Sequence, residues 1–194
     1  MGKRTDTRQR MIDAAKISYR HHGVTATGFT EVLERAGATR GTIYHHFPGG
    51  KEELAVAVVT SSGDNVEQMI RTLGDRSSSP LEAVNAFVDV CVAALEGTGG
   101  AFGCPIAPAV LESPDSDAVL NAAAKAFDQW KVAIEEQLSR AGVGGEHAVQ
   151  LATLLIAAVE GGFVLARATR SAGPMRDVGS AIGRLLDFEI EGAR

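Results

Sequence analysis

The segment ATRGTIYHHF, residues 38–47, carries more polar side chains than a short structural segment requires. Thr39, Arg40 and Thr42 stand at the expected start of a short helix. There the free backbone N–H groups and the positive end of the helix dipole favour an anion. These residue types at this spacing fit a phosphate group.

The rest of this segment separates into an apolar and a polar side. Ile43 and Phe47 are expected to turn into the protein, while Tyr44 carries a hydroxyl and His45 a ring donor on the other side. Gly41 costs a helix about 1 kcal/mol relative to Ala, and close approach of the backbone to another surface is a sensible reason for it. Taken alone, Tyr44 can equally well pack against its neighbours. As a set, these polar groups indicate a binding surface.

Short helices and tight turns must hold these side chains in place. Apolar spacing predicts a helix over residues 5–22 that stops at Gly23, a second over residues 29–36, and a third over residues 39–46 that Pro48 terminates. The second is barely two turns long and cannot be stable alone. Two short helices around an AGA turn form a helix-turn-helix, in which both helices share one core. The residues expected in that core are Ile12, Ala15, Tyr19, Val32, Leu33, Ala36, Ile43 and Phe47.

The same 3.6-residue periodicity predicts about six further helices. They cover residues 51–73, 81–96, 106–112, 115–141, 145–170 and a final segment that includes residues 175–185. The chain is therefore expected to be all-α, with about nine helices. A helix-turn-helix domain is expected in residues 1–50 and a larger helical domain in residues 51–194.

Charge is distributed unevenly along the 194-residue chain, whose net charge is −5. Residues 1–54 contain nine Lys and Arg against six Asp and Glu, a balance of +3, whereas the rest contains ten against eighteen, a balance of −8. The first part also holds four of the five histidines. A basic N-terminal part joined to an acidic body indicates that a polyanion binds at one end only.

The sequence offers no motif of an enzyme or a metal site. HExxH, GxSxG and SxxK are absent, so no catalytic residue, cofactor or metal ion is predicted. Cys91 and Cys104 lack CxxC spacing and a nearby histidine pair, and we interpret them as buried thiols. The apolar runs at residues 84–95 and 148–159 fall short of the roughly 20 residues of a bilayer span. Without a secretory signal at the N-terminus, we expect no membrane helix and a cytoplasmic location.

The stretch GVTATGFTEVLERAGATRGTIYHHFPGGKEEL resembles the DNA-binding region of TetR-family transcriptional regulators. The family pattern [ST]-[KR]-G-x-[LI]-Y-x-H-F followed by K-E-x-L fits residues 39–47 and 51–54, and the resemblance covers about residues 8–58. The extra glycine in FPGGKEEL and the GCP at residues 103–105 resemble one subgroup of repressors that answer small aromatic or drug-like molecules.

The resemblance implies an all-helical homodimer whose N-terminal domains enter successive major grooves of a near-palindromic operator, while the larger domain binds an effector and dimerises. It also implies that Tyr44, Thr42 and Lys51 touch phosphates, and that Arg40 and His45 are placed for bases or the backbone.

One position departs from the family pattern. Many members carry Ser or Thr where Gly28 stands, so Thr27 is expected to supply the hydroxyl contact instead. The residues expected to bind DNA are Thr27, Thr39, Arg40, Gly41, Thr42, Tyr44, His45 and Lys51.

The resemblance implies an effector site, and bulky or soft apolar side chains in the larger domain are its expected lining, although each of them is as readily explained as core. These residues are Phe87, Cys91, Phe102, Cys104, Phe127, Trp130 and Phe163. The last two helices carry apolar residues on two sides, and one side must be covered by something other than their own domain. The expected dimer interface is Val149, Ala152, Ile156, Val159, Phe163, Val178, Ile182 and Leu185.

The sequence therefore predicts a ligand-responsive DNA-binding regulator, a repressor that a small apolar or aromatic effector releases from its operator. Two alternatives stay open at this point. One is a helical enzyme, and the other is an interaction module that does not bind DNA.

Overall fold

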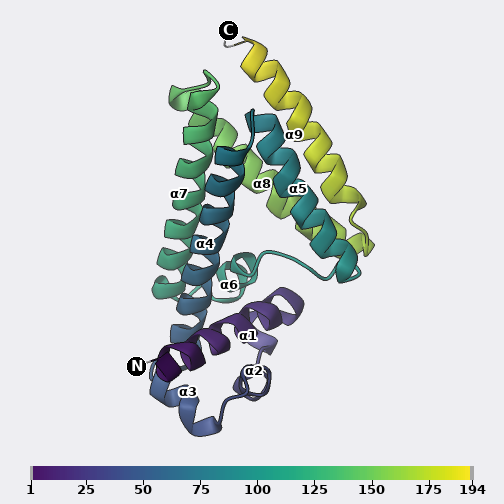
Figure 1. Ribbon diagram of the computed structural model, residues 1–194. Coiled ribbons are helices and arrows are strands. Elements are labelled where there is room, and N and C mark those ends of the chain that lie inside the picture. The colour runs from purple at the N-terminus through teal and green to yellow at the C-terminus, as the bar shows by residue number, and fades with distance from the viewer. Residues whose placement is uncertain (1, 193–194) are drawn as a thin grey trace. The chain divides into compact units, whose positions relative to one another are not determined.

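The computed structural model describes residues 2–192, with side chains from Asp6 onward, and within them it contains nine helices and no strand (Figure 1). The helices are α1 (Gly2–Ala26), α2 (Phe29–Ala36), α3 (Arg40–His46), α4 (Gly50–Arg76), α5 (Pro80–Gly97), α6 (Ile106–Glu112), α7 (Asp117–Arg140), α8 (Gly145–Thr169) and α9 (Gly173–Gly192). The all-α prediction is confirmed.

Local sequence signals account for most helix ends. Gly37 follows α2 with φ of 60° and ψ of 39°, the left-handed conformation that glycine adopts at little cost, so the AGA turn forms as expected. Ser79 is the N-cap of α5: its side chain accepts a hydrogen bond from the backbone N–H of Glu82, and the Glu82 carboxylate accepts one from the N–H of Ser78. These reciprocal bonds resemble a capping box and fix the start of α5.

The first helix differs from its prediction at the C-terminal end. Gly23 does break the helix, with φ of 80° and ψ of −178°, but one more turn follows and α1 ends at Ala26. The Thr27 hydroxyl donates a hydrogen bond of 2.6 Å to the carbonyl of Gly23, and the Thr27 N–H donates to the carbonyl of Val24. These bonds pair backbone groups that the break exposes, so the chain resumes a helical turn.

The chain forms two compact units. The first contains residues up to Asp64 together with Cys104–Ala126, and the second contains Asn65–Gly103 and the residues from Phe127 onward. Helices α4 and α7 each contribute residues to both units.

In the first unit, α1, α2 and α3 share one core. Every residue that the sequence placed there is buried, from Phe47, Ala15 and Val32 at 0% exposed to Leu33 and Ala36 at 4%. The helix-turn-helix is therefore held together by the apolar contacts that its periodicity predicts.

In the second unit, α9 packs against both α5 and α8. The approach of α9 to α5 is close because two glycines face it: a Cβ on Gly179 would lie 2.7 Å from a methyl of Val88, and one on Gly183 would lie 3.1 Å from Leu81. Two clusters of buried residues result, one around Leu151, Leu155, Ile182 and Leu186 and the other around Cys91, Leu95, Ala166 and Met175.

Helix α8 bears on the expectation that the chain has no membrane helix. Its 25 residues are long and apolar enough to cross a bilayer by length and composition alone. Only 28% of its most apolar 18-residue window is buried in the chain itself. The core helix of a soluble protein passes the same test, so this finding does not overturn the expectation.

Candidate nucleic-acid interface

Helix α3 begins as the sequence predicts but is capped differently. Thr39 occupies the N-cap position in an extended conformation, yet its side chain makes no bond to the backbone of the first turn. Its hydroxyl lies 2.8 Å from that of Thr42, and the Thr42 N–H donates to the carbonyl of Thr39 at 2.9 Å. No side chain caps the first turn, which leaves this end of α3 open to an anion, while the Thr42 N–H is already bonded within the turn.

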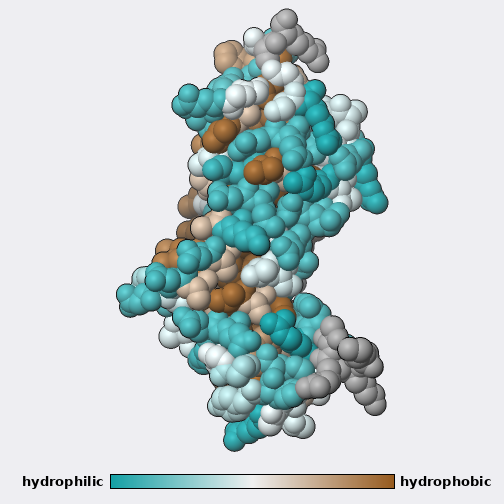
Figure 2. All heavy atoms as spheres, turned by 90° about the vertical axis from the view of Figure 1, so that its left-hand side faces the viewer, coloured by the Kyte–Doolittle hydropathy of each residue, from teal (hydrophilic) through white to brown (hydrophobic). Residues whose placement is uncertain are grey.

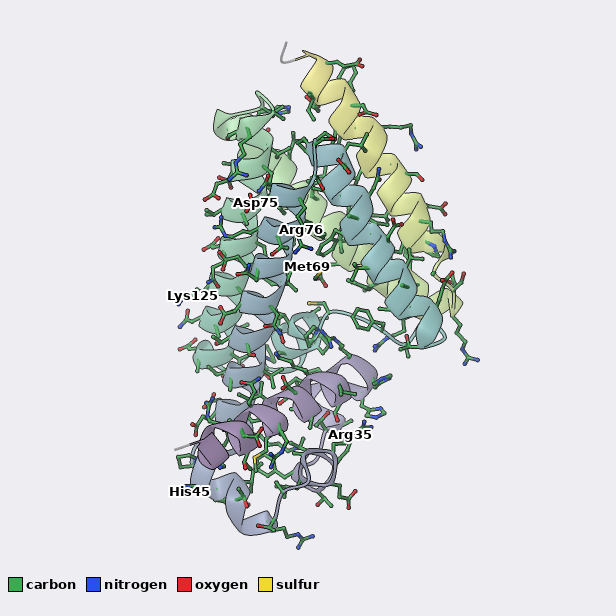
Figure 3. All side chains as sticks on the ribbon, in the orientation of Figure 1. Arg35, His45, Met69, Asp75, Arg76 and Lys125 are labelled. Carbon is green, nitrogen blue, oxygen red and sulfur yellow. The ribbon has the colours of Figure 1, made fainter. Side chains whose placement is uncertain are left out.

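The residues of α3 divide sharply between core and solvent. Ile43 is 1% exposed, whereas its neighbour Tyr44 is 66% exposed. Arg40, Gly41 and His45 are exposed as well, and Thr42 is half-buried. Figure 3 draws these side chains and labels His45 on α3. One face of the helix thus anchors it, and the other presents the polar groups singled out from the sequence.

The solvent-facing rings of α3 are supported by neighbours. The ring of Tyr44 packs edge-on against Phe29 of α2, with centroids 6.2 Å apart. The rings of His45 and His46 meet at 5.1 Å in a T-shaped arrangement, and His46 is half-buried. Tyr44 therefore has a restricted ring and an accessible hydroxyl, which suits a contact to a phosphate.

The start of α4 adds a further cation. Lys51 is exposed in the first turn of α4. Glu53 accepts a hydrogen bond of 2.8 Å from the backbone N–H of Gly49, which fixes the turn before the helix. Arg8 of α1, which the sequence analysis did not select, places its guanidinium 4.9 Å from the ring centre of Phe47. Its position on the basic face of α1 was the only signal for it in the sequence.

The structure does not support the expected DNA contact of Thr27. It is 4% exposed, and its hydroxyl is already bonded to the carbonyl of Gly23. Because the hydroxyl hydrogen is used inside the fold, Thr27 is not placed to donate to a phosphate. Its role is to hold the end of α1.

Three polar side chains that the sequence analysis missed hold α1 against its neighbours. The Arg10 guanidinium donates to the carbonyl of Ala36 at 3.0 Å, and the Ser18 hydroxyl donates to Glu31 of α2 at 2.7 Å. The hydrogen bond from Ser18 lowers the pKa of Glu31, and the one from Arg35 adds a smaller effect in the same direction. Partial burial opposes both. Only their three-dimensional neighbours reveal this role, since in the sequence they look like ordinary surface residues.

A buried lysine links α1 to α4 in the same unit. Lys16 is 5% exposed, and its Nζ donates to the hydroxyl of Ser61 at 2.8 Å and lies 3.5 Å from Asp13. Burial lowers the pKa of Lys16, and the nearby Asp13 opposes this shift. We call α1, α2, α3 and the first turn of α4 the reading head, because these contacts hold its helices together.

The residues expected to line an effector pocket fall into three groups. In the second unit, Phe87, Cys91, Phe102 and Phe163 belong to one cluster, in which the rings of Phe102 and Phe163 lie 5.9 Å apart. Phe127 and Trp130 form a separate T-shaped pair at 5.1 Å. Cys104 belongs to the first unit, where its sulfur accepts from the N–H of Ile106 at 3.4 Å.

The two cysteines differ in environment. Cys91 is 4% exposed, and burial, with a smaller effect of Glu160, raises the pKa of its thiol to about 12. Cys104 is only half-buried, so the prediction of two buried thiols is right for Cys91 and wrong for Cys104. Neither is part of a disulfide.

Burial within the single chain bears on two residues of the expected dimer interface. Ala152 and Ile182 are 0% and 5% exposed, so both are buried in their own chain. Five further residues of the set are half-buried. Four of them pack against the core clusters, namely Val159, Phe163, Val178 and Leu185, and the fifth is Ile156. Of the set, only Val149 is exposed, at 38%.

A different face of α8 is open to solvent. Its residues at intervals of three or four along the helix are Leu154, Ala157, Gly161, Val164 and Ala168, and Leu165 lies next to Val164. Leu154 is 49%, Val164 is 67% and Leu165 is 53% exposed. We call this set the open face of α8. Ala152 and Leu154 lie about 160° apart around the helix, which is why one is inside and the other outside.

The side of the molecule on which α7 lies offers a contrast. Viewed from that side, the surface is mostly hydrophilic, with apolar atoms in separate groups (Figure 2). Ion pairs between α4 and α7 in the second unit, Arg71 with Glu136 and Arg140 with Asp75, contribute to it.

Two family profiles match the sequence. Residues 11–58 match the family described as "Bacterial regulatory proteins, tetR family", and residues 80–181 match "Transcriptional regulator LmrA/YxaF-like, C-terminal domain". The second match alone covers more than half of the chain.

Similar proteins and structures agree with these matches. The uncharacterized HTH-type transcriptional regulator YxaF of Bacillus subtilis (strain 168) is 32% identical over 176 residues, 90% of this chain and 92% of that protein. The HTH-type transcriptional regulator LmrA of the same organism is 29% identical over 182 residues, 93% and 97% of the two chains. The crystal structure of regulatory protein TetR from Rhodobacter sphaeroides has a TM-score of 0.81 at 18% identity, covering 91% of this chain and 96% of that one. At that identity the likeness shows the fold.

Proposed function

Because the chain belongs to the TetR family of bacterial transcriptional regulators, we propose that it is a repressor that leaves its operator when a small apolar or aromatic effector binds. Members of this family are regulators and not enzymes, so the enzyme alternative is set aside. A regulator of transcription acts where its DNA is, and we therefore place the protein in the cytoplasm.

The proposed DNA-reading part is residues 1–50 with Lys51 beside it. Its interface is the solvent side of α3, where an exposed Arg40, a 66% exposed Tyr44 and an exposed His45 stand above the buried Ile43. This division of α3 is the observation that carries the proposal, because it leaves those three side chains exposed to solvent on the side opposite the core. Thr39, Gly41 and Thr42 complete the contact surface at the N-terminal end.

Residues 51–194 are proposed to bind the effector and to form the dimer. For the seam we propose the open face of α8 rather than the set expected from the sequence. An uncovered row of leucine and valine is costly in water, and a two-fold axis through it would let the same residues cover each other. Gly161 and Ala157 within the row permit close approach of two helices.

The proposed effector site lies near the cluster of Phe87, Cys91, Phe102 and Phe163. Its aromatic rings and thiol suit an apolar or aromatic molecule. The effector would favour the DNA-incompetent state through its higher affinity for that state, and the operator would favour the other. The single Trp of the chain, Trp130, is paired with Phe127 and provides an intrinsic fluorescence probe for binding.

The experiment begins with selection of double-stranded DNA from a random-sequence library by the purified protein. Titration of the selected duplex then compares wild type with Arg40→Ala and Tyr44→Phe. We expect a loss of roughly 1–3 kcal/mol for Arg40→Ala if Arg40 reads a base, and a salt slope reduced by about 1 for a lost phosphate contact. Arg140→Ala, which removes an exposed arginine from the second unit, is the matched control and should leave binding unchanged.

Two outcomes would contradict the proposal. Selection of no sequence would favour an interaction module that does not bind DNA. Equal affinity and equal salt slope for wild type, Arg40→Ala and Tyr44→Phe would remove α3 as the contact surface.

A further inference from the structure

Residues 112–116, which we call the corner, join α6 to α7 and touch the end of α1. Glu112 is the last residue of α6, and its Oε2 accepts a hydrogen bond of 2.7 Å from the backbone N–H of Thr25. Thr25 lies in the extra turn of α1 that follows the break at Gly23. The corner therefore holds the last turn of the first helix of the reading head.

The backbone at Gly23 has room for this carboxylate only because it is glycine. A Cβ at this position would collide with Oε1 of Glu112, and the φ of 80° would strain any other residue. Burial raises the pKa of Tyr19 to about 12, and the charge of Glu112 makes a smaller contribution in the same direction. The carboxylate thus approaches both the backbone and the buried side of α1.

The other end of the corner holds the start of α4. The Ser116 hydroxyl donates a hydrogen bond of 2.5 Å to Oε1 of Glu52, in the first turn of α4. The hydroxyl oxygen of Ser116 also accepts a hydrogen bond of 3.2 Å from the backbone N–H of Val119, which makes Ser116 the N-cap of α7. A hydroxyl can donate and accept at once, so both bonds form together. Ser116 is therefore fixed by α7 when it binds α4.

A small hollow lies beside the contact between Ser116 and Glu52. Its volume is about 150 Å³, and Val24, Glu52 and Ser116 are among the residues that line it. The corner is therefore not packed tightly against the start of α4 at this point, where the hydrogen bond between Ser116 and Glu52 forms.

The two contacts lie on either side of the helix pair in the chain. Residues 27–49, which contain α2 and α3, begin after Thr25 and end before Glu52. Attaching both ends of this segment to one short corner restricts the directions in which α3 can turn. We propose that the corner positions α3 for operator binding, with Glu112 and Ser116 as positioning residues.

The proposal rests on the proposed function, and its test keeps the two apart. Full-length wild-type protein first selects a duplex from a random-sequence library. If it selects none, the proposed function fails, while hydrogen exchange of residues 27–49 in the variants below still decides whether the corner restrains α2 and α3.

The variants form two matched pairs. Glu112→Ala and Glu112→Gln lose the same charge, but only Gln keeps an oxygen that can accept from Thr25. We expect Ala to bind the selected duplex about five- to tenfold more weakly than Gln, with equal affinity for random-sequence DNA and faster exchange in residues 27–49. Glu52→Ala and Glu52→Gln should repeat this result for the Ser116 contact. Asp128→Ala, at an exposed position of α7, controls for the lost charge and should bind within twofold of wild type.

Three results would overturn the proposal. The first is equal binding by the Ala and Gln members of both pairs. The second is an equal loss on selected and random-sequence DNA with a lower melting temperature, which would assign a purely structural role. The third concerns folding: if Glu112→Ala does not fold, equal binding and exchange in the Glu52 pair alone would reject the corner.

Discussion

Helices α3 and α8 expose opposite kinds of side chain to solvent. In α3 the buried Ile43 stands next to Tyr44, which is 66% exposed and polar at its tip. In α8 the buried Leu155 stands next to Leu154, which is 49% exposed and has no polar group. Water solvates the exposed groups of α3 without cost, whereas the exposed groups of α8 are stabilised only by further burial. The first surface suits a polar, charged ligand such as DNA, and the second suits another protein chain.

The largest expected effect separates the open face of α8 from its buried side. The double substitution Leu154→Glu with Leu165→Glu should raise the dimer dissociation constant by about 1,000-fold, roughly 4 kcal/mol, because it would bury unpaired carboxylates at a two-fold seam. Sedimentation of the protein at micromolar concentration checks this, with circular dichroism to confirm that the monomer is folded.

The matched control for this prediction is Glu146→Gln, an exposed position in the first turn of α8, outside the open face, which should leave the dimer intact. A stable dimer in the double variant would contradict the proposed seam and would leave the exposed leucines of α8 without an explanation.

Two adjacent residues of α3 should behave oppositely on truncation. Ile43→Ala should lower the free energy of unfolding by about 3 kcal/mol, because it empties a site in the core shared with α1 and α2. Tyr44→Ala should change stability by less than about 0.5 kcal/mol while weakening binding of the selected duplex. Guanidinium denaturation and DNA titration measure the two quantities. Similar destabilisation by both substitutions would mean that Tyr44 is a packing residue.

The contrast between these helices also explains how far the sequence could predict the structure. In α2 and α3 the apolar residues are few and lie on one side, so their spacing identifies Val32, Leu33 and Ile43 as core without ambiguity. In α8 apolar residues surround the helix, and no periodicity distinguishes Ala152, which is buried, from Leu154, which is open. Only the tertiary neighbours decide, because α9 and α5 cover some sides of α8 and leave one uncovered.

Long-range polar contacts could not be predicted for a related reason. Glu112 and Thr25 are 87 residues apart in the chain, and Ser116 and Glu52 are 64 apart. Each is an ordinary surface residue when judged by its own segment. The glycines are a similar case: nothing in their own segment shows that Gly179 and Gly183 lie against Val88 and Leu81 of the same chain.

A glycine substitution tests that placement with a smaller effect. Gly179→Ala should lower the free energy of unfolding by about 2 kcal/mol, because the new methyl would lie 2.7 Å from a methyl of Val88 between α9 and α5. Ser180→Ala, at the exposed next position, should change stability by less than about 0.5 kcal/mol. Denaturation curves of both variants provide the measurement. Loss of the dimer with an unchanged free energy of unfolding in Gly179→Ala would instead place this glycine at the dimer seam.

The smallest expected effect concerns the pH dependence of the reading head. The hydrogen bond from Ser18, followed by that from Arg35, holds the pKa of Glu31 below its ordinary 4.5, against the opposing effect of partial burial. Since the folded pKa is lower than the unfolded one, ionised Glu31 stabilises the fold above pH 4.5, and this stabilisation is lost as the pH falls through the folded pKa. Exposed ion pairs of this kind contribute roughly 0.5 kcal/mol.

Wild type should therefore lose slightly more unfolding free energy than Glu31→Gln between about pH 6 and pH 3, measured by guanidinium denaturation. Glu34→Gln removes an exposed carboxylate from the same helix and controls for the charge. Identical pH profiles for wild type and Glu31→Gln would show that Glu31 holds α1 and α2 together without its charge.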